Sequence, residues 1–209
     1  MQAPKPMRLV YELRGQSKGL NYSADAVLDW RHDGRNYQAV MEVSAFLIGS
    51  RSQTSSGRLD SEGLVPERFV DRSRRERITQ FDHEAGLVRN VPGGSVQAMP
   101  AGTQDRLSVF IQLAIQLSGL EQAPGPGDGW TLPVAATRAI EDWTFDWLGS
   151  EELTLPAGRL QTWHLERHPQ QPGDVRVEVW LAPELGHMPA RLLLQQANGD
   201  NMDQSLLRH

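Results

Sequence analysis

Apolar and polar residues alternate along most of the chain, with the period of two that is typical of β-strands with one buried face. Leu9, Tyr11 and Leu13 begin the pattern, and it continues over residues 22–30 and 37–47 on either side of an Asp-Gly pair that favours a tight hairpin turn. After more polar segments, the alternation returns at 141–148, 161–167 and 175–181. The pattern therefore predicts a mainly β protein made of antiparallel strands.

One segment breaks the alternation and predicts a helix over about residues 104–118. Thr103 and Asp105 are candidate N-caps, residues 107–117 contain neither glycine nor proline, and Gly119 marks the end. Apolar residues occur on almost every side of this helix, so it must be buried on most sides. We therefore expect a strongly curved antiparallel sheet, an open or half barrel, wrapped around one buried α-helix.

The length of 209 residues suits one large domain or two small ones. Residues 123–129 form a loop rich in proline and glycine, but each flank holds too few strands to fold alone. We expect residues 1–6 to be a disordered leader and residues 7–209 to be a single β-rich domain. The last predicted strand spans residues 190–197, and residues 198–200 turn the chain into a short tail.

Composition and charge exclude several classes of function. The net charge of −5 gives no general attraction to nucleic acid or anionic membranes, so no nucleic-acid partner is expected. The chain has no cysteine, which excludes disulfides, thiolate zinc sites, iron–sulfur clusters and a cysteine nucleophile. No apolar run approaches the roughly 20 residues that span a bilayer, and no glycine-rich phosphate loop is present. We therefore expect neither a transmembrane segment nor a cofactor.

Aromatic residues gather on one face of the strand at 141–148, where Trp143, Phe145 and Trp147 alternate with polar residues. The more common role of such a face is core packing, here against the helix. The alternative is that Trp143, Phe145 and Trp147, with Trp163 and Phe110, line a cleft for an apolar ligand, since the mouths of barrels are frequent ligand sites.

Four arginines, Arg72, Arg74, Arg75 and Arg77, cluster in a predicted hairpin. Guanidinium groups bind carboxylates, phosphates and anionic headgroups, so the cluster is a candidate partner-docking site. The alternative is a solvated hairpin whose arginines pair with cross-strand carboxylates. This is the more common role of surface charges.

His164, Glu166 and His168 are spaced by two, which places them on one side of an extended chain. Imidazole and carboxylate groups in this pattern could ligate zinc or another borderline metal, with a fourth ligand from elsewhere. The solvated outer face of a strand is the favoured interpretation, because Trp163 and Leu165 need the inner face and metal sites normally require further ligands. We therefore expect no metal.

No pattern gives positive support to catalysis. The chain has no nucleophile elbow and no HExxH helix. Residues 180–189 include Trp180 and His187, but two prolines and Gly186 suit a loop that joins two antiparallel strands. An enzyme is therefore not expected.

Several segments together resemble a bacterial family of exported proteins, domain-of-unknown-function family 3108. Each motif is a weak turn or strand signal alone, and the specificity comes from their order along most of the chain. The matching segments are Ser56-Gly57-Arg58-Leu59, Gly63-Leu64-Val65-Pro66-Glu67-Arg68-Phe69, Phe81-Asp82, Gln104-Asp105-Arg106-Leu107-Ser108, Leu155-Pro156-Ala157-Gly158, Trp180-Leu181-Ala182-Pro183 and Pro189-Ala190-Arg191. The resemblance implies a periplasmic protein with an antiparallel β-rich fold and no assigned catalytic residues, with a signal peptide that the printed sequence lacks.

Three functional hypotheses follow. The first is a non-catalytic protein of the bacterial cell envelope that binds a lipid-like or other apolar ligand in the concavity of its sheet. The second is a structural module that docks an envelope protein through the hairpin at 72–77. The third is a metal-dependent hydrolase, which only the residues at 164, 166 and 168 support.

Overall fold

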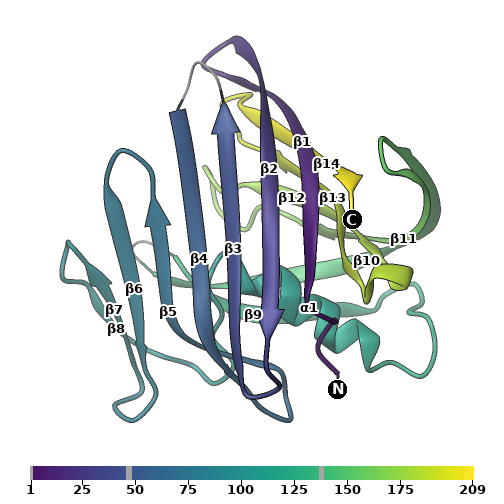
Figure 1. Ribbon diagram of the computed structural model, residues 1–209. Helices are drawn as coiled ribbons and strands as arrows, with labels where there is room; N and C mark the ends of the chain where they lie inside the picture. The colour runs from purple at the N-terminus through teal and green to yellow at the C-terminus, as the bar shows by residue number, and fades with distance from the viewer. Residues whose placement is uncertain (1, 46–48, 137–138) are drawn as a thin grey trace.

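The structure is a computed structural model that describes residues 2–45, 49–136 and 139–209. Within these ranges it contains fourteen strands, one α-helix and one short 3-10 helix (Figure 1). The elements are β1 (Met7–Ser17), β2 (Leu20–His32), β3 (Asn36–Ala45), β4 (Gly49–Leu59), β5 (Leu64–Arg72), β6 (Glu76–Asp82), β7 (Leu87–Val91), β8 (Val96–Ala98), α1 (Ser108–Ser118), β9 (Gly129–Ala135), β10 (Ile140–Leu155), β11 (Gly158–Arg167), β12 (Arg176–Ala182), η1 (Pro183–Leu185), β13 (Met188–Gln195) and β14 (Asn201–Arg208).

All fourteen strands join one antiparallel sheet, in the order β8-β7-β6-β5-β4-β3-β2-β1-β14-β13-β12-β11-β10-β9. Successive strands along the chain are therefore neighbours almost everywhere, as in a run of hairpins. There are two exceptions: β1 pairs with β14, which joins the first and last strands, and β8 and β9 form the two edges of the sheet although they follow one another along the chain. The mainly β, antiparallel fold predicted from the alternation is confirmed.

The end of the chain differs from the sequence prediction. Residues 201–208 form the strand β14, which pairs with both β1 and β13, instead of a short tail. Met202, Gln204 and Leu206 alternate as a strand requires, but a glutamine occupies the middle inward position. Gln204 is buried although it is polar, so the pattern of hydrophobic residues alone does not predict this strand.

The sheet curves around α1. In Figure 1, β1–β6 form a tall wall while β9–β12 cross behind it, with α1 at the lower end. One side of the helix, with Leu107 and Ile111, packs into the core formed by the first strands. The other side, with Val109 and Leu113, packs against residues of β9–β13. The helix is apolar nearly all round because it fills the space between two halves of one sheet.

The helix is shorter than predicted. It begins at Ser108 and ends at Ser118, whereas the sequence pattern places its start near residue 104. Gln104 instead forms a parallel bridge with Val134 of β9, through backbone hydrogen bonds of 2.8 Å to Pro133 and Ala135. Asp105 acts at the start as expected of a cap, since its Oδ1 accepts hydrogen bonds of 2.8 Å from the backbone N–H groups of Leu107 and Ser108.

The segment before β1 is held by a buried contact. Pro4 is buried, and its carbonyl accepts a hydrogen bond of 2.8 Å from the indole nitrogen of Trp30. A buried tryptophan needs such a partner for its N–H group, so this contact joins the predicted leader to β2, and the disorder of residues 1–6 stays a prediction. Met1 of that leader, and Leu47 of the alternating stretch 37–47, lie outside the described residues.

Candidate functional site

A cavity of about 380 Å³ lies beside α1 on the concave side of the sheet. It has the size of the smaller ligand pockets of proteins, which span about 300–1,000 Å³. Most of its wall is apolar, and the apolar and aromatic side chains come from strands at both ends of the fold and from the helix. They are Tyr11, Leu28, Met41, Val43, Leu107, Phe110, Ile111, Trp143, Val175, Val177, Pro189, Leu192, Leu194 and Met202.

The five aromatic candidates divide between this cavity and the core. Phe110 and Trp143 line the cavity and meet edge to face, with ring centroids 6.3 Å apart. Phe145 is fully buried in the core and contacts both rings. Trp147 and Trp163 pack against each other at 5.5 Å and do not line this cavity. Core packing and cavity lining therefore coexist on one aromatic face, and ligand binding by these residues stays a prediction.

A buried arginine lies on one side of the cavity. The Arg167 side chain is 3% exposed, and its guanidinium carbon lies 4.7 Å from the ring centre of Trp143. Its Nη1 donates a hydrogen bond of 2.6 Å to the carbonyl of Val175, and its Nη2 lies 3.4 Å from Asp174 and 4.0 Å from Glu141. Two carboxylates thus balance this cation, as a buried charge requires.

A second pocket, of about 350 Å³, adjoins the first one. Arg51 and Arg106 line both pockets, and Arg77 and Asp71 line the second pocket alone. Arg51 donates a hydrogen bond of 2.9 Å to Oδ1 of Asp71. Burial alone would raise the pKa of Asp71, but the hydrogen bond and charge of Arg51, with smaller contributions from Gln53 and Arg106, outweigh it and lower this pKa. The carboxylate therefore stays ionised beside three arginines.

The four arginines of the predicted hairpin do not act as one cluster. Arg72 pairs with Glu76 across the β5–β6 turn, as the alternative of a solvated hairpin with cross-strand carboxylates predicts. Arg74 and Arg75 are exposed in the turn. Arg77 instead lines the second pocket. Partner docking by all four together stays a prediction that no contact in the structure tests.

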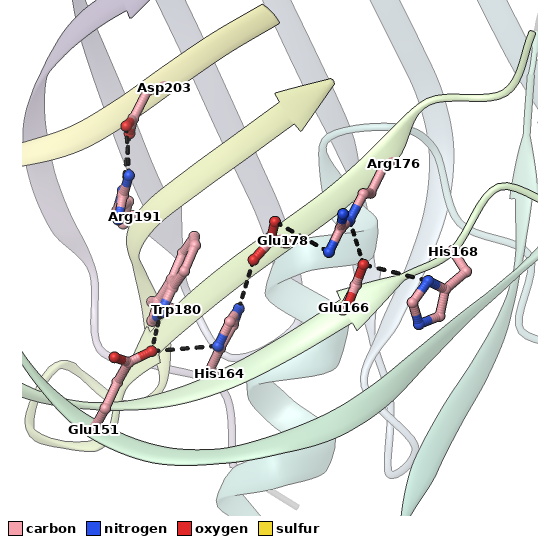
Figure 2. A network of polar contacts seen from close by, with 9 residues as sticks. All are labelled: Glu151, His164, Glu166, His168, Arg176, Glu178, Trp180, Arg191 and Asp203. Atoms are coloured by element: carbon pink, nitrogen blue, oxygen red, sulfur yellow. Dashed lines mark hydrogen bonds and ion pairs between the residues drawn. The ribbon is translucent and has the colours of Figure 1, made fainter. Parts of the chain in front are cut away.

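The three residues considered for a metal lie in a network of ion pairs on β11 and β12 (Figure 2). His164 has a carboxylate on each side: its Nδ1 lies 3.3 Å from Glu151, and its Nε2 lies 3.1 Å from Glu178. Glu166 pairs with Arg176, and His168 lies 3.3 Å from Glu166. Both ring nitrogens of His164 are therefore engaged by carboxylates other than Glu166.

This arrangement is a network of polar contacts that includes ion pairs between arginines and carboxylates. Within the described ranges, no group of three histidine, aspartate or glutamate side chains is placed to hold a metal ion. Arg176 supplies a cation between Glu166 and Glu178, where a metal would otherwise have to balance the two carboxylates.

Trp180 stacks at the end of the same network. Its ring lies 4.2 Å from the His164 ring at an angle of 15°, and the Arg191 guanidinium carbon lies 4.7 Å from its centre. Its indole nitrogen donates a hydrogen bond of 2.6 Å to Glu151. Arg191 in turn makes two hydrogen bonds, of 2.9 and 2.6 Å, with Asp203 (Figure 2). Trp180 is thus a packing anchor on β12.

The stretch 180–189 connects two strands, as predicted. η1 follows β12 directly, Gly186 takes a φ of 65°, and His187 takes a φ of 62° before β13 begins. His187 packs 4.5 Å from Trp163, and its Nδ1 lies 3.1 Å from the hydroxyl of Ser118 at the end of α1. Burial lowers the pKa of His187. Among the described residues, the contacts of the His187 ring are with an aromatic ring and a hydroxyl, and none is with the carboxylate that orients the histidine of a catalytic triad.

Hydrophobic patterning did not identify Arg51, Arg106 and Arg167 as cavity residues. A signal exists for Arg77: residues 77, 79 and 81 share one face of β6, and Thr79 and Phe81 are buried. The same period of two predicts that Arg77 faces the concave side. Arg106 has a weaker signal, since it comes directly before the apolar helix.

A known protein family matches almost the whole chain. The model of the family described as "Protein of unknown function (DUF3108)" matches residues 10–205. The chain belongs to this family. The resemblance drawn from the ordered turn and strand motifs is therefore confirmed. No curated protein is significantly similar to the chain in sequence.

One solved structure shows the same fold at low sequence identity. The β-barrel-like protein of domain of unknown function DUF1849 from Brucella abortus matches with a TM-score of 0.64 and 13% identity, over 99% of this chain and 98% of that chain. A putative outer membrane lipoprotein-sorting protein domain from Vibrio parahaemolyticus matches with a TM-score of 0.32 and 8% identity, over 95% of this chain and 82% of its own. The first match confirms the curved, barrel-like sheet, whereas a TM-score of 0.32 does not indicate a shared fold.

None of the helices in the described ranges has the length and the apolar character that crossing a membrane requires.

Proposed function

We propose that this protein is a non-catalytic binding protein of the bacterial cell envelope, which holds a lipid-like, apolar ligand in the concavity of its sheet. The observation that carries the proposal is the cavity of about 380 Å³ between α1 and the sheet. A site of this size with a mostly apolar wall and a few polar groups at its edge is typical of small-molecule binding. Location in the periplasm is part of the proposal and rests on what the family resemblance implies.

Two features of the wall support an apolar ligand. Val43 and Met41 contribute from β3, while Val177 and Leu192 contribute from β12 and β13, so both halves of the curved sheet face the same space. Phe110 and Trp143 add aromatic surface from the helix and β10. Burial of an alkyl chain here would gain about 25 cal/mol for each Å² of apolar surface removed from water.

The test is binding of an uncharged apolar dye, N-phenyl-naphthylamine, whose fluorescence rises in apolar surroundings. Val43→Phe places a larger side chain in the cavity, and we expect it to weaken dye binding by about tenfold or more, equivalent to about 1.4 kcal/mol. Val40→Phe is the matched control, because Val40 lies on the opposite face of the same strand and does not line the cavity. Both variants should keep the circular dichroism of a β protein.

The proposal is wrong if the wild-type protein does not bind the dye, or if both phenylalanine variants bind it as the wild type does. Native mass spectrometry of protein purified from a bacterial envelope gives an independent readout. We expect it to detect a co-purifying lipid that Val43→Phe reduces.

A further inference from the structure

The two pockets beside α1 differ in chemistry, although they meet at Arg51 and Arg106. The first has a mainly apolar wall. The second is lined by Arg51, Arg77 and Arg106, by a single carboxylate, Asp71, and by neutral side chains such as Thr79. A site with an apolar part next to a cationic part matches a molecule with an apolar chain and an anionic head.

From this arrangement we infer that the second pocket is a headgroup subsite, which receives the carboxylate or phosphate of a single-chain anionic amphiphile whose chain occupies the apolar cavity. The inference rests on the proposed function, since it names the chemical class of the ligand. It also gives the ligand an orientation. The head lies at β4 and β6, and the alkyl chain of the ligand extends along α1 toward β12 and β13.

The charges of the second pocket favour an anion there. Asp71 accepts the hydrogen bond from Arg51 and offsets one of the three positive charges. Arg77 and Arg106 form no ion pair with another described residue, and both side chains are accessible. Two guanidinium groups are therefore available for the paired hydrogen bonds by which arginine binds carboxylate and phosphate.

The part of the cavity wall around Arg167 does not favour an anion. Arg167 also lines the cavity, but Asp174 and Glu141 lie 3.4 and 4.0 Å from its Nη2. Two carboxylates beside one guanidinium leave a net negative charge, which would repel an anionic head. The head therefore belongs at Arg77 and Arg106 rather than at Arg167.

The geometry also fixes the position of Arg106. It directly follows two anchored residues, because Gln104 is bridged to β9 and the Asp105 carboxylate accepts hydrogen bonds from Ser55 and from the backbone of Ser108 in α1. The backbone at Arg106 is thus held at the junction of the two pockets, while its side chain remains exposed. A cation on a rigid element is suited to binding, since little backbone order is lost when the ligand binds.

The experiment compares ligands with the same chain and different heads in displacing N-phenyl-naphthylamine. Laurate and lauryl phosphate carry an anionic head, and lauryl alcohol carries a neutral one. In the wild type we expect the anionic ligands to bind about tenfold more tightly than the alcohol, a preference that declines as salt is raised. The double variant Arg77→Gln/Arg106→Gln should bring the ratio of laurate to alcohol affinity close to one.

Arg74→Gln is the matched control, since Arg74 is an exposed arginine of the same β5–β6 region and lines neither pocket. It should leave the ratio unchanged. Equal binding of laurate and lauryl alcohol by the wild type would overturn the headgroup subsite while the apolar cavity stands. A strong preference for laurate that survives the double variant would overturn the assignment to Arg77 and Arg106. Failure of the dye itself to bind would instead contradict the proposed function.

Discussion

Ser55 of β4 donates a hydrogen bond of 2.5 Å to Oδ2 of Asp105, a fully buried carboxyl group at the start of α1. The other oxygen of Asp105 accepts from the backbone N–H groups of Leu107 and Ser108. This contact joins the wall of the sheet to the helix that it surrounds. It also places Arg106 where the two pockets meet, so one buried polar group organises both the fold and the candidate site.

Asp105 should make stability depend on pH in an unusual direction. Burial raises the pKa of Asp105. Because the folded state then takes up a proton at a higher pH than the unfolded state, its free energy of unfolding increases as the pH falls. Compared with Asp105→Asn, which does not titrate, the wild type should gain stability from neutral pH down to the unfolded pKa of about 3.9. Urea denaturation of both proteins over this pH range measures the difference.

Asp33→Asn is a control with the opposite sign. Backbone N–H groups of Asn36 and Arg35 hold the Asp33 carboxylate and lower its pKa to about 2. Its contribution is complete above the unfolded pKa of about 3.9 and is lost as the pH falls through the folded pKa. The wild type should therefore lose stability relative to Asp33→Asn in that acidic range. A flat difference for the Asp105 pair would show that burial does not disfavour its charged form.

Gly63 should not tolerate a side chain. A Cβ at this position would lie 2.2 Å from Oε1 of Gln112, and its φ of +125° is one that only glycine adopts readily. Gln112 accepts a hydrogen bond of 2.7 Å from the backbone of Leu64 and donates one of 2.8 Å to Glu62, so a clash there would break two bonds between α1 and the β4–β5 turn. We expect Gly63→Ala to lower the free energy of unfolding by about 2–4 kcal/mol.

Gly158→Ala separates the clash from the backbone strain. Gly158 has a similar φ of +116°, but no atom would lie within 4 Å of its Cβ. Urea denaturation should therefore show a smaller loss, of about 1–3 kcal/mol, from strain alone. Equal losses in the two variants would mean that Gln112 moves aside without cost.

Arg191 should not be replaceable by lysine. Its guanidinium makes two hydrogen bonds with Asp203 and stacks on Trp180, and 29% of its side chain is exposed. Lysine keeps the charge but cannot make the planar, two-bond contact. We expect Arg191→Lys to cost about 1 kcal/mol in thermal or chemical denaturation.

Arg31→Lys tests whether that cost comes from the partly buried setting. Arg31 makes the same pair of hydrogen bonds with Asp29, both 2.7 Å long, but 73% of its side chain is exposed. Exposed ion pairs contribute little, so this variant should leave stability unchanged. A comparable loss at both positions would show that the stack on Trp180 adds nothing.

The alternation of residues was sufficient to predict most of the sheet, because each strand has one buried face and one solvated face. It failed at two buried glutamines, where a polar residue lies inward. Buried Gln204 interrupts the apolar alternation of β14, so this strand was not predicted. Gln104 was predicted to be helical but forms a bridge with β9. The bridge of Gln104 joins two segments that are distant in sequence, so local patterning contains no sign of it.

The candidate site was less predictable for the same reason. The aromatic face identified Phe110 and Trp143, which line the cavity, but it could not separate them from Phe145, which lies in the core. That distinction depends on tertiary packing, which residue alternation along one strand does not contain. The charged wall combines residues from β4, β6 and the segment just before α1, and the pairing of β4, β5 and β6 together with the packing of the helix brings them together.

Trp143 should report ligand binding directly. It lines the cavity, whereas the other aromatic candidates on β10 and β11, Trp147 and Trp163, pack on each other away from it. An alkyl chain in the cavity would replace water near the Trp143 ring, so titration with lauryl alcohol should shift the tryptophan emission of the wild type to shorter wavelength. Trp143→Phe should remove most of this shift, and Trp147→Phe should retain it. A shift that disappears with Trp147→Phe and persists with Trp143→Phe would place the ligand on the other side of Phe145, outside the cavity that α1 and the concave sheet enclose.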